Sequence, residues 1–413
     1  MNIAVIGSGI SGMVAAYLLS ADHEVTMFEA NDYIGGHTNT REIQIQGTTY
    51  AVDTGFIVCN AATYPNFLTL MKQLGITLQP SEMSFSVKCE RTGLEYRPST
   101  LNTFFIQRRN LVSPSFYRII LDILRFKRRA EEVLHTADDS LTLGHYLKTR
   151  RYSPMFIDYF IIPMGAAIWS TAPDKFMDFP ARYFVQFFKN HGFLNIRQPQ
   201  WLVIQSGSKS YIPPLTQAYR DRIRLQCPVI AVKRHPDHVE VTPKQGEPER
   251  FDQVVLATHS DQALKLLTDA SEAEREILSA IPYQENLTIL HTDTSLLPQR
   301  RAAWASWNYH IPREPLERVA LTYDMNILQR LDAPVEFCVT LNRPHAMDAA
   351  KILHKILYHH PQYTPRGIAA QQRHAEISGV NRTHFCGAYW GYGFHEDGVN
   401  SALAVGKYFG KTL

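Results

Sequence analysis

The stretch Ile3-Ala4-Val5-Ile6-Gly7-Ser8-Gly9-Ile10-Ser11-Gly12 decides the fold of this chain. Its four leading apolar residues predict a buried strand, and the Gly-x-Gly-x-x-Gly spacing after them predicts a tight turn that opens a helix. The segment Val25 to Glu29 then predicts a second strand. A strand, a helix and a strand in this order form a βαβ unit, in which the crossover helix makes the two strands pair in parallel.

The glycine spacing predicts that this unit binds a dinucleotide. Gly7 permits the tight turn, Gly9 lets backbone amides approach a pyrophosphate, and Gly12 lets the helix pack closely on the strand. Ile10 and Ser11 open the helix, so their amides belong to the N-terminus that would face the anion.

A second pair of glycines favours FAD over NAD. Glu29 ends the second strand, where its carboxylate can accept both hydroxyls of an adenosine ribose, and this geometry disfavours the 2′-phosphate of NADP. After Ala30, the run Gly35-Gly36-His37-Thr38 lies where the chain must pass close under an extended cofactor, which an NAD domain does not need. We therefore expect FAD, contacted by Glu29, Ala30 and this run. A Gly-Gly loop without a ligand is the alternative.

The composition of the 413-residue chain is that of a folded, soluble protein, with 45% hydrophobic and 20% charged residues. A net charge of +3 provides no field that would recruit nucleic acid. The five cysteines are scattered and form no Cys-x-x-Cys pair, so we expect a reducing cytoplasm and no metal site. No stretch offers the roughly 18 uncharged apolar residues that a membrane-spanning helix requires.

The order of predicted elements indicates an α/β fold with two interleaved domains. One is a Rossmann-like FAD-binding domain with a parallel sheet, and the other is an α+β substrate domain. We assign to the FAD-binding domain residues 1–80, 206–282 and 376–413, and to the substrate domain residues 81–205 and 283–375. An antiparallel hairpin is expected at 84–97 and mostly helices at 114–190. Further expected elements are a last helix from about Val399 and strands at Ile223 to Val232, Val239 to Thr242, Val254 to Ala257 and His384 to Tyr389.

Motifs along the whole chain resemble the flavin amine oxidase superfamily, which includes monoamine oxidases, phytoene desaturases and protoporphyrinogen oxidase. Besides the two glycine motifs, the similar segments are Val52-Asp53-Thr54-Gly55-Phe56, Cys227-Pro228-Val229 and Phe251 to Thr258. The resemblance implies that the first lies beside the flavin, the second meets the adenine and the third passes the pyrophosphate. It thus implies FAD contacts by Asp53, Thr54, Gly55, Phe56, Val229 and Ala257. The superfamily usually has Arg after the glycine pair, where this chain has His37.

The run Phe385 to Leu403 resembles the C-terminal strand, loop and helix of the same superfamily. The resemblance implies that the helix points its positive N-terminus at the flavin N1 and C2 carbonyl, with Gly398, Val399 and Ser401 located there. Ala388 stands where the superfamily commonly has Glu or Asp, so Asp397 becomes the candidate for the ribityl contact.

The loop between that strand and that helix holds the candidate catalytic residues. A flavin carries out the electron transfer itself, so the protein has to place a C–H bond, exclude water and tune the ring. His395 and Glu396 are predicted to act as acid or base over the flavin, and Tyr389 and Trp390 to wall the substrate. The alternatives are core packing for the two aromatic residues and capping of the helix N-terminus for Glu396 or Asp397. A second group, expected to line the substrate domain, comprises His291, Asp293, Trp304, Trp307, Asn308 and Tyr309.

A closer resemblance is to bacterial amine-oxidase-like FAD proteins that are often encoded beside cyclopropane-fatty-acid synthases. It rests on Tyr64-Pro65-Asn66, Trp307-Asn308-Tyr309 and the run Gly393 to Gly398. This resemblance implies desaturation or double-bond isomerisation of an unsaturated fatty acyl chain by hydride transfer to flavin N5, with the FAD held noncovalently. A flavin amine oxidase and an FAD-stabilised binding protein are the alternatives. The loop Tyr389 to Gly398 contains neither the Lys nor the Cys that many amine oxidases of the superfamily carry.

Residues Pro114 to His135 predict an amphipathic helix that is rich in arginine. Such a face can rest on anionic lipid, so peripheral contact with the inner face of the membrane is one expectation for this otherwise cytoplasmic protein. The alternative is a helix that packs its apolar side on the core and leaves its arginines in solvent. The expected partner is a small hydrophobic or lipid substrate, and the sequence does not predict the oligomeric state.

Overall fold

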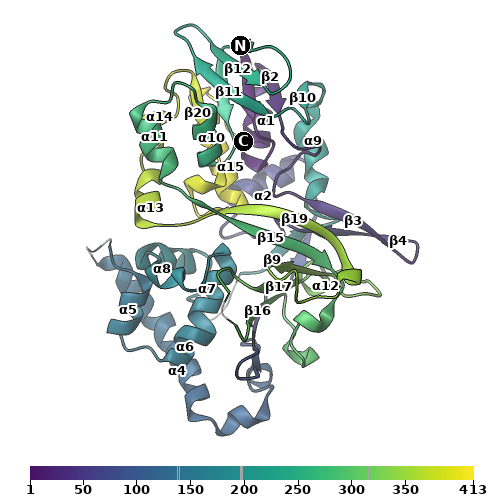
Figure 1. The fold of residues 1–413 in the computed structure, drawn as a ribbon, viewed down its shortest axis with the longest axis vertical. Helices are drawn as coiled ribbons and strands as arrows, with labels where there is room; N and C mark the ends of the chain where they lie inside the picture. The colour runs from purple at the N-terminus through teal and green to yellow at the C-terminus, as the bar shows by residue number, and fades with distance from the viewer. Residues whose placement is uncertain (137, 139, 196–198, 315) are drawn as a thin grey trace.

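Residues 1–136, 138, 140–195, 199–314 and 316–413 are described in the computed structural model of the chain. The N-terminal strand lies in a five-stranded sheet at one end of the molecule, in the upper part of Figure 1. From edge to edge this sheet contains β10 (Ile223–Arg224), β2 (Glu24–Phe28), β1 (Asn2–Ile6), β14 (Gln253–Leu256) and β20 (Thr383–Phe385). All of its strand pairs are parallel. The α/β fold class with a Rossmann-like parallel sheet is thereby confirmed.

The central strand β1 is buried on both faces. Ile3 and Val5 pack in one hydrophobic core with α1 (Ile10–Leu19), α2 (Pro65–Gln73), α9 (Ile212–Thr216) and α15 (His395–Tyr408). Ala4 and Ile6 pack in a second core with α10 (Ser260–Leu266), α11 (Glu272–Ser279), α13 (Pro365–Gln371) and α14 (His374–Ile377). Burial on both faces explains why this strand is a continuous apolar run and does not alternate.

The prediction of one continuous strand from Ile223 to Val232 is wrong. Its first two residues form the edge strand β10, and the rest forms β11 (Val229–Arg234) in a separate antiparallel sheet with β12 (Val239–Pro243) and β13 (Glu249–Phe251). Between them, Gln226 has a left-handed backbone with φ of 50°. Pro228 follows, which has no N–H for a strand ladder, so the chain leaves the parallel sheet here.

The C-terminal strand is shorter, and the last helix longer, than predicted. β20 ends at Phe385, and Ala388–Trp390 form one 3-10 turn in place of the expected strand end. The backbone N–H of Gly387 donates to Ser401 Oγ at 2.9 Å and not to a neighbouring strand. Helix α15 begins at His395, four residues before Val399, because the Asp397 carboxylate accepts the Phe394 N–H at 2.9 Å and caps the first turn.

A second, seven-stranded sheet crosses the middle of the molecule. Its order is β19 (Ile352–Pro361), β15 (Tyr283–His291), β18 (Cys338–Leu341), β17 (Leu321–Asp324), β16 (Trp307–Ile311), β7 (Phe85–Cys89) and β8 (Leu94–Tyr96). Figure 1 shows the long strands β15 and β19 passing beneath the parallel sheet. The hairpin predicted at 84–97 is confirmed, since β7 and β8 pair antiparallel. Smaller elements are α12 (Met325–Leu328), the pair β3 (Thr40–Ile45) and β4 (Thr48–Asp53), and the sheet of β5 (Val58–Asn60), β9 (Trp201–Ile204) and β6 (Leu78–Ser81).

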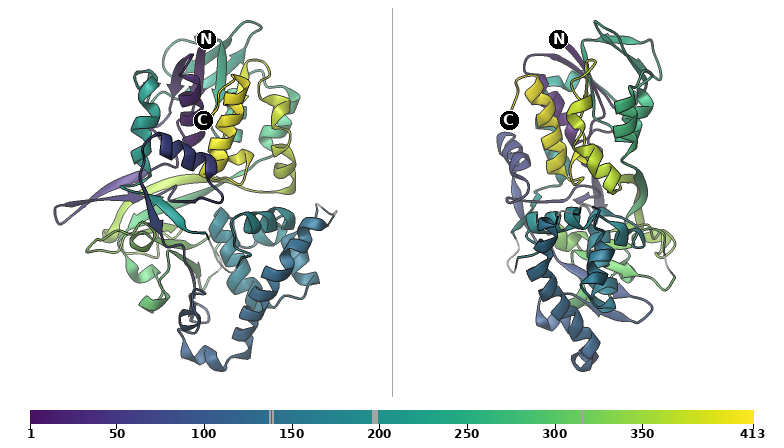
Figure 2. Two further views of the ribbon diagram at one scale, coloured as in Figure 1. Left: turned by 180° about the vertical axis from the view of Figure 1, so that it is seen from behind. Right: turned by 90° about the vertical axis from the view of Figure 1, so that its left-hand side faces the viewer.

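Helices fill the end of the molecule opposite the parallel sheet, as both views of Figure 2 show. They are α3 (Leu101–Phe104), α4 (Pro114–Arg129), α5 (Leu143–Thr149), α6 (Pro154–Phe156), α7 (Ile162–Trp169) and α8 (Ala181–Asn190), so the helical prediction for 114–190 is confirmed. Their core is mostly aromatic. In the described part of the chain, no helix combines the length and apolar character needed to cross a membrane. The domain boundaries assigned from the sequence stay a prediction.

The packing of α1 on β1 gives a test of the fold. A Cβ placed on Gly12 would overlap the Gly7 carbonyl oxygen and lie 3.0 Å from Ala257 Cβ. We expect Gly12→Ala to lower the free energy of unfolding by about 1–3 kcal/mol, because the helix must move off the strand. Gly9→Ala is the matched control, since its φ is −65° and a Cβ there meets no atom within 4 Å. Equal denaturation midpoints for the two apoproteins would contradict this packing argument.

Candidate functional site

The two glycine motifs pack against each other at the carboxyl edge of the parallel sheet. The Gly35 N–H donates to the Ser8 carbonyl at 3.1 Å and contacts Ser8 Oγ at 3.2 Å. A Cβ placed on Gly36 would lie 3.3 Å from Gly9 Cα, so the backbones touch where a side chain would separate them. Beside Gly9 itself there is open space. This gives a backbone cradle of the kind that an extended dinucleotide requires.

The N-terminus of α1 lies at this cradle. Its N-cap is Gly9, which offers no side-chain cap, and the first turn carries no acidic residue. The first amides of a helix have no partner inside the helix, and the helix dipole adds partial positive charge. The amides of Ile10 and Ser11 are therefore suited to an anion such as a pyrophosphate.

Glu29 organises the turn next to this cradle. Its Oε2 accepts hydrogen bonds from the Ser8 N–H at 3.0 Å and the Ser8 hydroxyl at 2.6 Å. Its Oε1 accepts from the backbone and side-chain nitrogens of Asn31, both at 2.8 Å. A ribose would compete with the two side-chain donors, which can rotate away. The ribose contact stays a prediction, as do those of exposed Ala30 and half-buried Val229.

Asp53 is fully buried and binds groups of the protein itself. Its carboxylate accepts hydrogen bonds from Thr40 Oγ1, from Ser208 N and Oγ at 2.9 Å each, and from Gln329 Nε2 at 2.9 Å. Burial raises the pKa of Asp53 to about 6 despite these donors. Through these hydrogen bonds, Asp53 at the end of β4 connects to Ser208 in the turn after β9 and to Gln329 just after α12. The structure gives it a positioning role, and its predicted contact with FAD stays untested.

The segment after Asp53 lies against the second glycine motif. A Cβ on Gly55 would overlap the His37 carbonyl, and the Phe56 N–H donates to that carbonyl at 2.7 Å. The Thr54 hydroxyl donates to the Asn39 carbonyl at 3.0 Å. These predicted cofactor residues are therefore brought together with His37, although they are distant in sequence.

His395 is buried in an aromatic and hydroxyl environment. Its ring stacks on Phe56 with 3.6 Å between centroids, and its Nε2 lies 3.0 Å from Thr38 Oγ1 and 3.2 Å from Tyr211 Oη. Burial lowers the pKa of His395 to about 3, so the imidazole is neutral at physiological pH. A neutral imidazole can donate or accept a hydrogen bond but is a weak base. The acid–base role predicted for His395 stays a prediction that this environment does not favour.

Glu396 caps a helix, but the helix is α2 and not its own. Its Oε1 accepts the Asn66 N–H at 3.0 Å and its Oε2 accepts the Phe67 N–H at 2.8 Å. Both carboxylate oxygens are thus bonded to the otherwise unpaired amides at the start of α2. These contacts favour the capping alternative over the predicted acid–base role.

The first turn of α15 packs directly on the first turn of α1. A Cβ on Gly398 would lie 2.7 Å from Ile10 Cγ2 and 3.0 Å from Ser11 Oγ. The Ser401 hydroxyl donates to the Gly398 carbonyl at 2.8 Å, while Val399 is buried in the hydrophobic core. Burial raises the pKa of Asp397 to about 6. The predicted residues of both helices therefore meet, and two positive helix ends converge on one place.

Tyr389 is buried, and Trp390 packs against the hydrophobic core that contains α10, α11, α13 and α14. Their rings are 5.0 Å apart, and Trp390 also contacts His374 edge-on at 4.5 Å. The backbone carbonyl of Tyr389 accepts a hydrogen bond from Gln371 Nε2 at 2.7 Å. These contacts are those of the core alternative, and a role in walling the substrate stays a prediction.

The second polar and aromatic group lies in and beside the seven-stranded sheet. His291 Nε2 is 2.7 Å from Thr340 Oγ1, and Asp293 accepts hydrogen bonds from the backbone of Ser295 and Asp348. Asn308 bonds to Ser86 and to neighbouring backbone. Trp304 Nε1 donates to the Pro298 carbonyl at 2.8 Å. These hydrogen bonds thus go to the sheet and to neighbouring turns of the protein itself, which agrees with a packing role.

Sequence reasoning missed two sets of residues near the site. One is aromatic: Tyr183, Phe187, Tyr363 and Phe394 form a contact group where α8 meets the C-terminal loop, together with Tyr392, which the sequence had already placed beside the flavin. The spacing of Tyr183 and Phe187, one helical turn apart, was the available signal. The other set is three histidines, His259, His359 and His360, which lie near His37. No sequence pattern connects these histidines with His37, because the four residues come from three separate segments.

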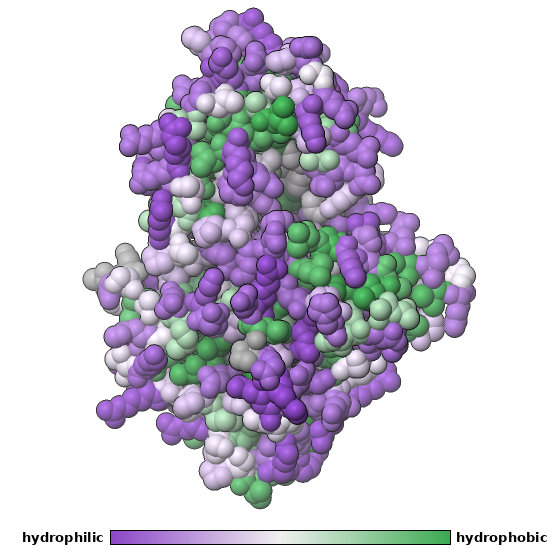
Figure 3. All heavy atoms as spheres, in the orientation of Figure 1, coloured by the Kyte–Doolittle hydropathy of each residue, from purple (hydrophilic) through white to green (hydrophobic). Residues whose placement is uncertain are grey.

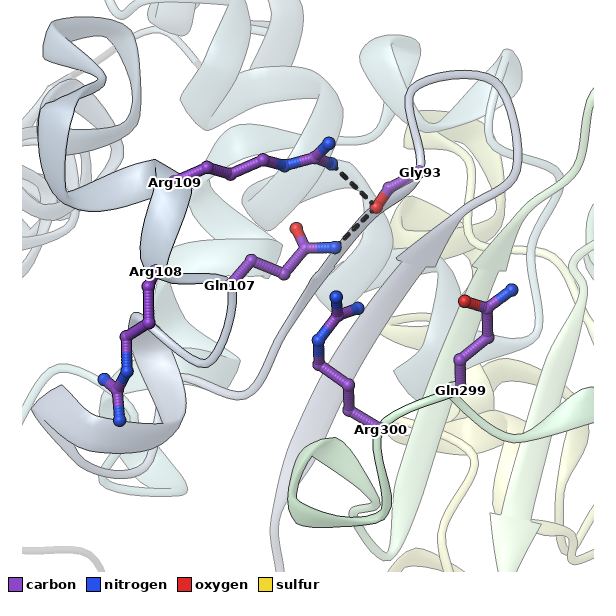
Figure 4. A pocket seen from close by; sticks show the side chains of 6 residues that line it. All are labelled: Gly93, Gln107, Arg108, Arg109, Gln299 and Arg300. Atoms are coloured by element: carbon purple, nitrogen blue, oxygen red, sulfur yellow. Dashed lines mark hydrogen bonds between the residues drawn. The ribbon is translucent and has the colours of Figure 1, made fainter.

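A surface depression lies apart from this site, beside the turn between β7 and β8. Figure 4 shows its lining, in which Gln107 and Arg109 both donate to the Gly93 carbonyl, at 2.7 Å and 3.1 Å. Arg300 pairs with the Glu95 carboxylate at 3.2 Å. Several of its polar groups are thus already bonded within the protein.

The two assignments of Glu396 can be separated by experiment. We expect Glu396→Gln to lower the free energy of unfolding by about 1 kcal/mol, because α2 loses an anionic cap, while the rate per bound flavin stays unchanged. Glu247→Gln, in an exposed loop, is the control. Thermal denaturation and single-turnover flavin reduction, measured on the same preparations, distinguish the two roles. A slower rate per flavin with unchanged stability would restore the acid–base assignment.

Comparisons with known proteins agree with this geometry. The family model for flavin containing amine oxidoreductase matches residues 10–294. The L-amino-acid oxidase of Bungarus fasciatus is 43% identical over 47 residues, a match that spans only 11% of this chain and 9% of that protein. Among solved structures, cyclohexylamine oxidase from Brevibacterium oxydans IH-35A aligns with a TM-score of 0.71 and 16% identity over 99% of both chains. A CLA-producing fatty acid isomerase from P. acnes aligns with a TM-score of 0.70 and 17% identity over 98% of both chains.

At these identities the structural likeness shows the fold alone. The family match is broader, because it covers more than half of the chain, from the start of α1 to beyond β15. The glycine cradle and the two converging helix ends lie within the same fold. This chain therefore belongs to the flavin-containing amine oxidoreductases and is an FAD-dependent oxidoreductase.

Proposed function

We propose that this protein holds FAD noncovalently and acts on an unsaturated acyl chain or a related hydrophobic lipid, moving or introducing a double bond. The observation that carries the proposal is an aromatic wall, formed by Tyr183, Phe187, Tyr363, Tyr392 and Phe394. Phe187 and Phe394 stack with 5.3 Å between ring centroids, and Tyr183 lies 4.5 Å from Tyr392. Such rings bury hydrocarbon favourably, and the Tyr183 hydroxyl is already bonded to the Gly391 carbonyl at 2.8 Å.

The residues present fit FAD. The Gly9 cradle has the space, and the first turns of α1 and α15 supply two positive helix ends. Within the described part of the chain, His37 Nε2 and Tyr363 Oη are buried without a hydrogen-bond partner. These two atoms therefore retain hydrogen-bonding capacity for a polar ligand. Noncovalent binding is supported by Cys386, the cysteine of the C-terminal segment, because burial raises its pKa far above the ordinary range.

When bound, FAD supplies the two-electron chemistry by taking a hydride from a substrate C–H bond at N5. This chemistry would serve double-bond migration, which is redox-neutral overall, and also desaturation, which would need an external electron acceptor. The protein's part is to orient the chain against the aromatic wall and exclude water. His395, held near Thr38 and Tyr211, can supply a fixed neutral hydrogen-bonding group.

An amine substrate is the second candidate, and Asp397 is the observation that favours it. Its charge acts on the hydroxyls of Tyr183, Tyr363 and Tyr392, so a carboxyl group lies near the aromatic wall and could pair with an ammonium. Against this, Asp397 already caps α15, and burial raises its pKa to about 6, which disfavours the charged form. The third candidate, a binding protein without turnover, predicts no flavin reduction by any substrate.

A substrate panel tests these candidates. We expect acid precipitation to release all the flavin as FAD, and linoleate or oleate to change the flavin spectrum anaerobically or to yield shifted or added double bonds by mass spectrometry. Tyr392→Ala should weaken this response roughly tenfold, through lost apolar burial of about 1–2 kcal/mol. Tyr408→Ala, at an exposed ring, is the control. Reduction by cyclohexylamine or putrescine but by no lipid would replace the proposal with the amine oxidase.

We propose that the protein meets its substrate at an anionic membrane surface through α4 and the segment before it. The helix buries Phe116, Ile119 and Phe126, but Leu121 is 59% and Leu124 is 47% exposed. Further exposed apolar side chains in this region are Leu101, Leu111, Val112 and Tyr117. Figure 3 shows hydrophobic surface at the lower tip of the molecule, the end where these elements lie.

Basic side chains accompany this apolar surface. Arg128 and Arg129 line a depression together with Leu121 and Leu124. Arg125 also lines it, although its guanidinium lies 4.4 Å above the Tyr152 ring and so contributes to packing. Apolar side chains beside cations are the combination that binds an anionic bilayer surface.

The membrane contact can be tested with variants that spare Arg125. We expect Arg128→Gln with Arg129→Gln to weaken sedimentation with phosphatidylglycerol vesicles about tenfold or more, since each charge near such a surface contributes ~1 kcal/mol. Leu121→Ser with Leu124→Ser should weaken binding at high salt as well. Lys233→Gln with Lys244→Gln, at exposed positions of the FAD-binding domain, is the charge-matched control. Equal binding by all variants, or none by the wild type at low salt, would exclude this surface.

A further inference from the structure

Four histidines from three distant segments gather at the carboxyl edge of the parallel sheet. His37 lies in the loop after β2, His259 lies before α10, and His359 and His360 lie near the end of β19. The rings of His37 and His360 are 5.4 Å apart, and those of His259 and His359 are 6.0 Å apart. Strand β19 thus supplies one partner to each histidine of the FAD-binding domain. We call these four residues the histidine cluster.

The histidine cluster flanks the glycine cradle on two sides. His37 directly follows Gly36, whose backbone touches Gly9. On the other side, the Ala257 carbonyl lies 2.8 Å from the position of a Cβ on Gly7, and His259 follows two residues later. All four histidines are half-buried. They are therefore placed beside the backbone that is suited to a pyrophosphate, and they are not sealed in the hydrophobic core.

The surroundings of the histidine cluster leave it short of negative charge. Tyr358 stacks on His37, Tyr283 stacks on His259, and Asn286 Nδ2 lies 2.8 Å from His360 Nδ1. The groups that act electrostatically on the cluster are its own members, His395 and one acid, Asp261, which acts on His259. Within the described residues, His37 Nε2 is buried without a hydrogen-bond partner.

Three of the four imidazoles, those of His37, His259 and His360, are kept neutral in the protein alone. Burial first, and then the neighbouring histidines, lower the pKa of His37 well below its usual value. Burial also lowers the pKa of His360 and of His259 to about 4. A nearby anion acts in the opposite direction, because it stabilises the imidazolium. A ligand that brings fixed negative charge would therefore bind together with protons.

We propose that the histidine cluster is the phosphate-recognition wall of the cofactor site and that FAD binding is accompanied by proton uptake on it. This inference rests on the proposed FAD site. It goes beyond that site because it assigns His259, His359 and His360 to cofactor binding. It also explains how His37 can serve at the position where the superfamily usually has Arg. The diphosphate of FAD is a diester that keeps its charge throughout the neutral range, so any titration in that range belongs to the protein.

The sign of the effect follows from linkage. The histidine pKa values are low in the free protein and raised in the complex. At pH values between the two, the complex carries more protons than the free protein, so lowering the pH favours binding. We expect the dissociation constant for FAD to fall at least fivefold from pH 8 to pH 6. Where one full proton is taken up, the change is about tenfold per pH unit.

The test measures FAD binding to the apoprotein and needs no substrate. Titrations followed by flavin fluorescence at pH 6, 7 and 8 give the slope, and calorimetry in buffers of different ionisation enthalpy counts the protons taken up. We expect His37→Gln and His360→Gln each to reduce the slope and the proton count, and His37→Arg to bind at pH 8 as tightly as the wild type does at pH 6. His238→Gln, in the turn between β11 and β12, is the control and should keep the wild-type slope.

The outcomes separate this inference from the proposed function. A flat wild-type profile without proton uptake overturns the inference, as does a slope that all cluster variants retain. Circular dichroism at each pH checks that the variants are folded, and the gain of affinity in His37→Arg at pH 8 cannot arise from unfolding. Failure of the apoprotein to bind FAD at any pH would instead remove the cofactor assignment. Lipid turnover enters none of these measurements.

Discussion

Close backbone contact at the first turn of α1 is the constraint on which the rest of the structure depends. Gly12 lets α1 lie on β1, Gly36 lets the second loop touch Gly9, and Gly398 lets α15 pack on the same turn. A methyl group at Gly12 or Gly398 would separate these surfaces, because a built Cβ meets a neighbouring group at 3.0 Å or less. The glycines thus bring two helix N-termini to one edge of the sheet, where their partial charges add.

Around that turn, burial and hydrogen bonds set the charge of the ionisable side chains more than ion pairs do. Asp53 and Asp397 are carboxyl groups whose pKa burial raises to about 6, and each is bonded to protein donors. His395 is kept neutral by burial. The neighbourhood of the cradle therefore offers mostly neutral hydrogen-bonding groups and helix dipoles. In such a site, the bound cofactor would make the largest change in local charge. This agrees with a protein that positions a redox group and does not supply strong acids and bases.

The proposed cofactor site and the proposed substrate-binding surfaces are supplied mainly by opposite ends of the molecule. The parallel sheet holds the cradle, whereas the helical end supplies the aromatic wall from α8 and an exposed apolar face on α4. The long strands β15 and β19 connect them, and β19 also carries His359 and His360 toward the FAD-binding domain. Phe126 of α4 and Phe187 of α8 belong to the same hydrophobic core, so the aromatic wall and the exposed face of α4 lie at the same end of the molecule. This arrangement links the proposed substrate class to the proposed membrane surface.

The sequence by itself determined the features that depend on local backbone geometry. The run Ile3 to Gly12 predicted β1, the turn and α1, because a buried strand and a glycine spacing leave few alternatives, and the hairpin at 84–97 followed from its alternation and turn residues. Only the tertiary structure decided where Glu396 bonds, since its partners on α2 are about 330 residues away in the chain. The same holds for the histidine cluster and the aromatic wall. Their members come from segments that no local pattern connects, and burial, which sets their charge, is a property of the assembled fold.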